Sequence, residues 1–93
     1  MNINDSWRLN SKVILELSPG SGGGMLMDTA TATVCSVNSS AMKVLEALSS
    51  GANVEQLTQM LKANYKVSTK EAKQDVLSLF RQLRNMGLLE INA

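Results

Sequence analysis

The stretch TVCSVNSSAMKVLEAL, residues 33–48, decides the fold. Three of its first five residues are β-branched and none of the five is charged, which predicts a strand over 33–37. Asn38 is a residue type that caps helices. After it, apolar residues recur at the spacing of one helix face (Ala41, Val44, Leu45 and Leu48). The chain therefore changes from strand to helix at Asn38.

The sequence before residue 33 predicts two further strands. Residues 13–17 and 25–27 are mostly apolar, and a Gly-rich segment, residues 18–24, separates them. That segment could in principle hold a phosphate, but no Lys-Ser or Lys-Thr follows, so we interpret it as a flexible loop. Residues 28–32 form a turn, with Asp28 able to cap its own bend. The first eleven residues are expected to be flexible.

The sequence after Asn38 predicts three helices. Ser49-Ser50-Gly51 ends the first, and Asn53 with Gln56 forms a capping box for the second. Ser68 with Glu71 is a similar pair that opens the longest helix, Thr69 to about Met86, which Gly87 stops. Residues 88–91 can pack back or form a short strand. We expect one α+β domain over 1–93, with a three-stranded antiparallel sheet of sequential neighbours followed by three helices.

Composition excludes several classes of function. The chain has 93 residues, with nine Lys+Arg against eight Asp+Glu, no histidine and one cysteine. The net charge of +1 demands neither nucleic acid nor a membrane surface. Without histidine, Cys35 has no usual base to activate it, and no cluster of metal ligands is present. No basic-then-apolar signal segment opens the chain, and no apolar run approaches a membrane span. We expect a cytoplasmic protein without catalytic activity, metal or cofactor.

The long helix carries a basic stripe beside its apolar face. At about 100° per residue, one flank gathers four cations around a leucine (Lys70, Lys73, Leu77, Arg81 and Arg84). The opposite flank is neutral to acidic (Glu71, Asp75, Ser78, Gln82 and Asn85). An ordinary solvated face would explain the stripe. Alternatively, Leu77 and the cations could border a groove for a partner that carries apolar anchors and carboxylates.

The predicted strand over 33–37 has no residue that would protect an exposed edge. It contains no Lys, Arg, Asp, Glu or Pro. In a sheet of three sequential strands this strand is an edge. Its backbone can therefore accept a strand from a partner through Thr33, Val34, Cys35, Ser36 and Val37. The other interpretation is that a helix or a second copy of the chain covers it.

The order of short motifs resembles the PqqD family. The carrying residues are Val37-Asn38-Ser39-Ser40-Ala41 with Leu48 and Gly51, then Val54-Glu55-Gln56-Leu57, then Val76, Phe80, Leu83 and Gly87-Leu88-Leu89. Upstream, Met25-Leu26-Met27-Asp28 and Thr33 to Asn38 look like the family's paired strands. The likeness spans residues 12–90. It departs in the third strand, where many members have Tyr and Leu and this chain has Cys35 and Val37.

The resemblance implies a winged-helix-like module that recognises precursor peptides. Such a module binds the leader of a ribosomally made, post-translationally modified peptide as an antiparallel strand on residues 33–37, beside helix 69–86. It then presents the peptide to an enzyme, frequently of the radical S-adenosylmethionine class. The expected state is a monomer or weak homodimer, with no nucleic acid and no membrane as partners. A winged-helix DNA-binding regulator and a passive dimerisation domain are the alternatives.

Overall fold

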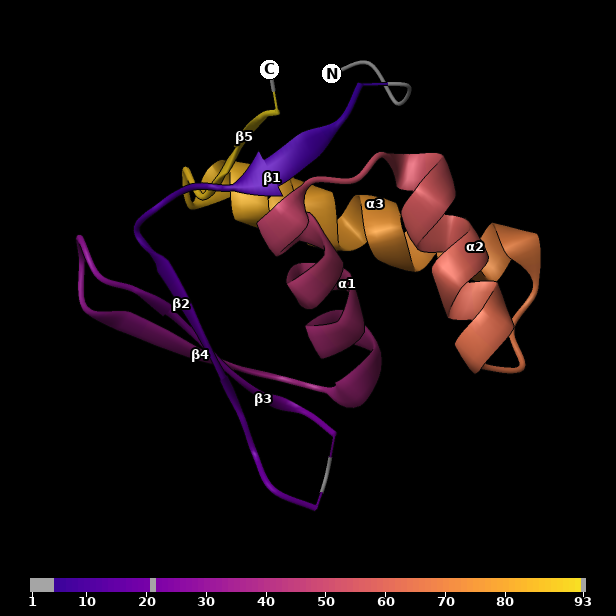
Figure 1. Cartoon of the computed structure of the whole chain (residues 1–93), viewed down its shortest axis with the longest axis horizontal. Coiled ribbons are helices and arrows are strands. Elements are labelled where there is room, and N and C mark those ends of the chain that lie inside the picture. Colours follow the sequence, from indigo (N-terminus) through magenta and orange to yellow (C-terminus); the bar gives the residue numbers. More distant parts are fainter. Residues whose placement is uncertain (1–4, 21, 93) are drawn as a thin grey trace.

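The computed structural model describes residues 5–20 and 22–92 of the chain. Four strands come first, then three helices, then a last short strand (Figure 1). The elements are β1 (Trp7–Leu9), β2 (Val13–Leu17), β3 (Gly24–Asp28), β4 (Thr33–Val37), α1 (Ser39–Ser50), α2 (Val54–Asn64), α3 (Thr69–Asn85) and β5 (Leu89–Ile91). The expected α+β class, with three sequential strands followed by three helices, is confirmed.

The main sheet is antiparallel with the order β2-β3-β4. Met27 of β3 pairs with Ile14 on one side and Val34 on the other. The turn between β3 and β4 is held by Asp28, whose carboxylate accepts hydrogen bonds from the Ala30 N–H at 3.0 Å and the Thr31 hydroxyl at 3.1 Å. Asp28 therefore caps its own bend, as the sequence predicts.

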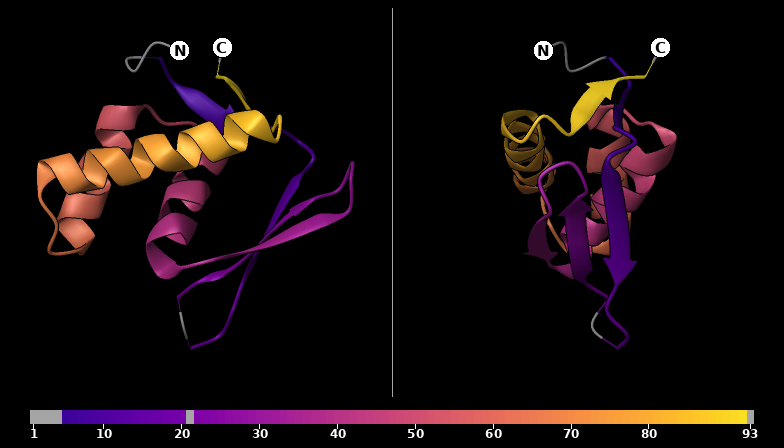
Figure 2. Two further views of the ribbon diagram at one scale, coloured as in Figure 1. Left: turned by 180° about the vertical axis from the view of Figure 1, so that it is seen from behind. Right: turned by 90° about the vertical axis from the view of Figure 1, so that its left-hand side faces the viewer.

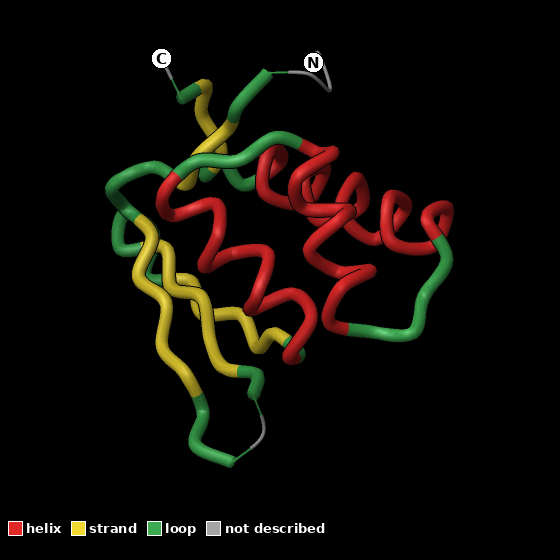
Figure 3. Tube along the Cα trace, turned by 45° about the vertical axis from the view of Figure 1, so that its right-hand side comes forward, coloured by secondary structure: helices red, strands yellow, loops and turns green. Residues whose placement is uncertain are grey.

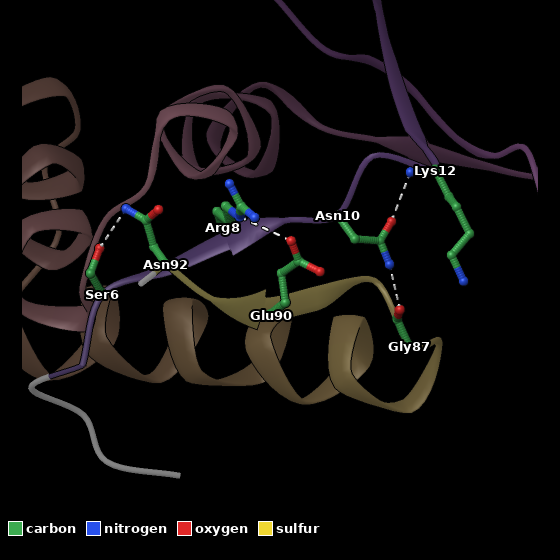
Figure 4. A network of polar contacts seen from close by, with 7 residues as sticks. All are labelled: Ser6, Arg8, Asn10, Lys12, Gly87, Glu90 and Asn92. Atoms are coloured by element: carbon green, nitrogen blue, oxygen red, sulfur yellow. Dashed lines mark hydrogen bonds and ion pairs between the residues drawn. The ribbon is translucent and has the colours of Figure 1, made fainter.

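A second, two-stranded sheet joins the two ends of the chain. β1 pairs antiparallel with β5, and Trp7 also exchanges backbone hydrogen bonds with Ala52. Side chains reinforce the pairing: Arg8 and Glu90 form an ion pair at 2.9 Å, and the Asn10 amide donates to the Gly87 carbonyl at 2.7 Å (Figure 4). The sequence predicts no strand before residue 13, so β1 is an addition to the predicted fold, and it lies within the eleven residues that are expected to be flexible.

The helix ends follow the predicted caps. The Asn38 side chain accepts the Ala41 N–H at 2.9 Å, and Asn53 with Gln56 forms a reciprocal capping box. Ser68 accepts the Glu71 N–H at 3.1 Å. At the end of α3 the Leu88 N–H reaches the Leu83 carbonyl at 2.9 Å, while Gly87 adopts a φ of 72°. This is the left-handed Schellman stop that Gly87 predicts.

All three helices lie on one side of the main sheet (Figures 1 and 3). α3 and α2 pack together, and α1 lies between them and the sheet. α1 is therefore buried on two sides: Val44, Leu45 and Leu48 are buried as predicted, and Met42 is completely buried as well. Met42 reaches the backbone of β3 at Gly24. The core of α3 is the predicted one, with Ala72, Val76, Phe80 and Leu83 buried.

Candidate functional site

The predicted strand over 33–37 is an edge of the main sheet. β4 has β3 as its only neighbour among the strands of the described residues, 5–20 and 22–92. Figure 2 shows β4 as the outer strand, on the side of the sheet where α3 passes. The strand carries no charged residue. β4 therefore offers an open, undefended edge beside a helix.

The backbone groups of β4 that point outward can be worked out from the hydrogen bonds between β2 and β3. Two bonds, one at each end of this strand pair, fix the alternation. The Ser18 N–H donates to the Gly23 carbonyl at 2.8 Å, and the Thr29 N–H donates to the Lys12 carbonyl at 2.9 Å. Antiparallel pairs alternate between bonded and non-bonded. Every second residue of β3 between these two bonds, Met25 and Met27, therefore bonds to β2.

The remaining residues of β3 bond to β4. They are paired with Thr33, Cys35 and Val37, which consequently direct their backbone groups inward. Val34 and Ser36 direct their N–H and C=O groups toward the open edge. Two backbone N–H donors and two C=O acceptors can therefore pair with an added strand.

The two faces of β4 differ in their surroundings. Val34 lies on the outer face, 49% exposed, in one cross-strand row with Ile14 and Met27. Cys35, opposite the buried Leu26, lies on the inner face toward the helices and is partly buried. Because opposite residues share a face, an added strand would direct the residues opposite Cys35 and Val37 toward the helices.

Two adjoining hollows lie where β4 runs into α1. The first, about 240 Å³, lies between the start of α1, Leu61 of α2 and one flank of α3. Its lining residues are Asn38, Ser40, Ala41, Val44, Leu61, Asp75, Ser78, Leu79 and Gln82. The second, about 210 Å³, shares four of these residues and adds Ser39, Tyr65 and Val67. We call the two together the α1–α3 groove. It begins at the residue that follows β4.

The flank of α3 that faces the α1–α3 groove is the neutral-to-acidic one. Asp75, Ser78, Leu79 and Gln82 contribute to it. Leu77, Arg81 and Arg84 instead line a separate hollow of about 410 Å³ with Asn85. On an α-helix these two flanks lie roughly 150° apart.

The structure therefore divides the predicted site into two surfaces. β4 is an open edge strand, as the sequence predicts, but of its residues Thr33, Val34, Cys35, Ser36 and Val37 only Val34 and Ser36 direct their backbone groups outward. The basic stripe stays together as a stripe, with its four cations exposed and Leu77 half-buried. Its members are Lys70, Lys73, Leu77, Arg81 and Arg84, and none of them lines the α1–α3 groove. Their role in peptide binding stays a prediction.

Sequence reasoning missed the groove residues as a group. The sequence marks Asn38 only as a helix cap, and Tyr65 and Val67 lie between the second and third predicted helices. One signal was available: Asp75, Ser78 and Gln82 occupy one helical flank beside the apolar face. A helical wheel gives no reason to prefer this flank over the basic one.

No other part of the described chain presents a stronger site. Within residues 5–20 and 22–92, no three Cys, Asp or Glu side chains come together as metal ligands. The ion pair between Arg8 and Glu90 is exposed and holds β1 to β5. None of the helices in this part of the chain is long and apolar enough to cross a membrane.

Comparisons with known proteins agree with this fold. The family described as Coenzyme PQQ synthesis protein D (PqqD) matches residues 23–89. A structure of TbiB1 in complex with the TbiA(beta) leader peptide is 20% identical with a TM-score of 0.78, covering 89% of this chain and 94% of that chain. A structure of lasso peptide synthetase B1 complexed with the leader peptide is 21% identical with a TM-score of 0.75, covering 90% and 96%. No curated protein sequence matches.

At 20% and 21% identity the two solved structures establish a shared fold. The family match, in contrast, extends over well more than half of the sequence. The chain belongs to the PqqD family.

Proposed function

We propose that this chain is a non-catalytic accessory protein that binds the leader of a ribosomally made precursor peptide and presents it to a modifying enzyme. The observation that carries the proposal is the open edge of β4, where Val34 and Ser36 direct their backbone groups outward beside the α1–α3 groove. Family membership supports it, and both similar structures hold a leader peptide.

Binding begins with backbone pairing. An added strand can form four hydrogen bonds with Val34 and Ser36, each contributing about 0.5–1.5 kcal/mol net. Together they contribute about 2–6 kcal/mol, whereas a micromolar complex needs about 8 kcal/mol. Burial of leader side chains against the helices must supply the difference. The α1–α3 groove offers the half-buried Leu79, Tyr65 and Val67 for such contacts.

The accessory role follows from holding the peptide rather than changing it. A bound leader keeps the rest of its precursor near any enzyme that also binds this chain, which raises the effective concentration of substrate. We propose further that this enzyme is of the radical S-adenosylmethionine class, as the resemblance to the family implies, and that the protein acts in the cytoplasm as a monomer or weak homodimer. These assignments belong to the proposal.

A peptide selection followed by an NMR titration tests the proposal. A random peptide library is displayed and selected on the wild-type chain, and an enriched peptide is titrated into isotope-labelled protein. We expect the largest amide shifts at Val34 and Ser36 and at residues of the α1–α3 groove. Failure to enrich any peptide, or shifts confined to the basic stripe of α3, would contradict strand addition at β4.

The DNA-binding alternative is tested with the same preparation. Its basis is the exposed basic stripe on α3. A gel shift on random duplex DNA at about 150 mM salt should show no complex, since four cations support few phosphate contacts. A complex that survives this salt and is lost after charge reversal of Lys73 and Arg81 would favour the regulator instead.

A further inference from the structure

We propose that Asp75 makes the α1–α3 groove select a peptide that carries an apolar side chain next to a Lys or Arg, at the N-terminal end of its paired segment. This inference rests on the proposed function and names the class of peptide that the same site accepts. It differs from the acidic partner that the basic stripe suggests.

The groove has a mixed lining, in which apolar side chains lie beside polar ones. Val44 and Leu61 are buried core residues whose edges line the first hollow, and Leu79 is half-buried there. Tyr65 and Val67 extend this lining into the second hollow. Each hollow, of about 240 and 210 Å³, has room for one aliphatic or aromatic side chain.

Asp75 is the one charged residue that lines either hollow, and it lines both. Its carboxylate is exposed and makes no hydrogen bond or ion pair with any residue of the described ranges, 5–20 and 22–92. Glu71 lies one turn earlier on the same flank, where it contacts the Ser68 hydroxyl. No Lys or Arg lines the two hollows. The charge that lines the hollows is therefore negative, which favours a peptide cation over a peptide carboxylate.

The sheet direction places this contact along the peptide. Both strand pairs of the main sheet are antiparallel, so an antiparallel addition to β4 sets its N-terminal end opposite Val37. Asn38, the next residue, lines both hollows together with Asp75. The apolar anchor and the cation should consequently precede or coincide with the residue opposite Val37.

The test compares the peptides that different variants enrich from one displayed random library. Wild-type protein, Asp75→Asn and Asp75→Lys are selected in parallel. Glu46→Lys serves as the control, because it makes the same charge change at an exposed position of α1 outside both hollows. Enriched peptides are then checked for NMR shifts at Val34 and Ser36.

We expect wild-type peptides to be enriched in Lys or Arg at one N-terminal position beside an apolar residue. Asp75→Asn should lose this preference, Asp75→Lys should replace it by Asp or Glu, and Glu46→Lys should keep it. A Lys-containing wild-type peptide should bind Asp75→Lys about 2- to 10-fold more weakly, a difference that shrinks at high salt.

The outcomes separate the two proposals. Peptides that shift Val34 and Ser36 but show the same composition on wild type and Asp75→Lys would overturn the role of Asp75 and leave strand addition intact. Absence of any peptide that shifts β4 would overturn the proposed function and this inference with it.

Discussion

Replacing Val34 by proline removes one outward backbone donor of β4 without removing a bond to β3. The register places Val34 opposite Met27 in a pair whose backbone groups point away from each other. Its side chain is 49% exposed on the outer face, so little core packing is lost. The preceding Thr33 is already extended, which is the conformation that a following proline favours. The variant should therefore fold.

The loss of peptide affinity can be worked out from the groups involved. The bound peptide loses one hydrogen bond, and its carbonyl is left facing the proline ring without a donor. A missing bond with an unsatisfied partner costs about 1–3 kcal/mol. The dissociation constant should accordingly rise roughly 5- to 150-fold, since about 1.4 kcal/mol corresponds to a tenfold change.

The assay is a fluorescence anisotropy titration of a labelled peptide enriched on the wild-type chain. Leu17→Pro is the matched control, because Leu17 lies on the opposite edge strand β2 with an exposed side chain and an outward-pointing N–H. It should bind like wild type. Circular dichroism verifies that both variants fold. If Val34→Pro binds within about twofold of wild type, the peptide does not pair with β4 and the central inference is refuted.

Three further predictions concern exchange, charge and stability. In hydrogen-exchange NMR, the Val34 and Ser36 amides should exchange fast in the free protein and slow on peptide addition, while Cys35 should be protected in both states; equally slow exchange without peptide would mean that the edge is already covered. Reversing Lys73 and Arg81 to Glu should leave peptide affinity within about twofold if only the α1–α3 groove holds side chains, whereas a larger loss would bring the basic stripe back into the site. Asn53→Ala breaks the α2 capping box and should lower stability by about 1 kcal/mol, seen as a fall in Tm of roughly 4–8 °C, whereas an unchanged Tm would mean that the cap contributes nothing.

Local signals in the sequence predicted most elements of this fold. Asn38, Asn53, Ser68 and Gly87 each act through neighbours within five residues, so their caps could be read directly. β1 could not. It has three residues, and its partner β5 lies at the far end of the chain. A pairing over that separation leaves no periodicity for a sequence pattern to show.

Of the candidate site, only the edge strand over residues 33–37 could be predicted from the sequence. An uncharged run over 33–37 is visible in the sequence, and the order of strands made it an edge. The choice between the two flanks of α3 depends on how the helix rotates about its axis against α1 and α2. That rotation follows from the packing of Phe80 and Val76 into the shared core. Both flanks border the same apolar face, so the charge pattern alone does not decide which flank lines the α1–α3 groove.

β4 and α3, the two elements that would border a bound peptide, are both held firmly by the rest of the fold. α3 is fixed at its start by Ser68, at its end by the Schellman turn at Gly87, and beyond that by the pairing of β5 with β1. β4 is fixed along its whole length by β3. Because α3 and β4 are both ordered in the free chain, most of the conformational entropy lost on binding is lost by the peptide. Backbone pairing with Val34 and Ser36 is the same for almost any sequence without proline, so it cannot distinguish one peptide from another. Discrimination must therefore arise where side chains meet the helices, and our proposal assigns it to the α1–α3 groove around Asp75.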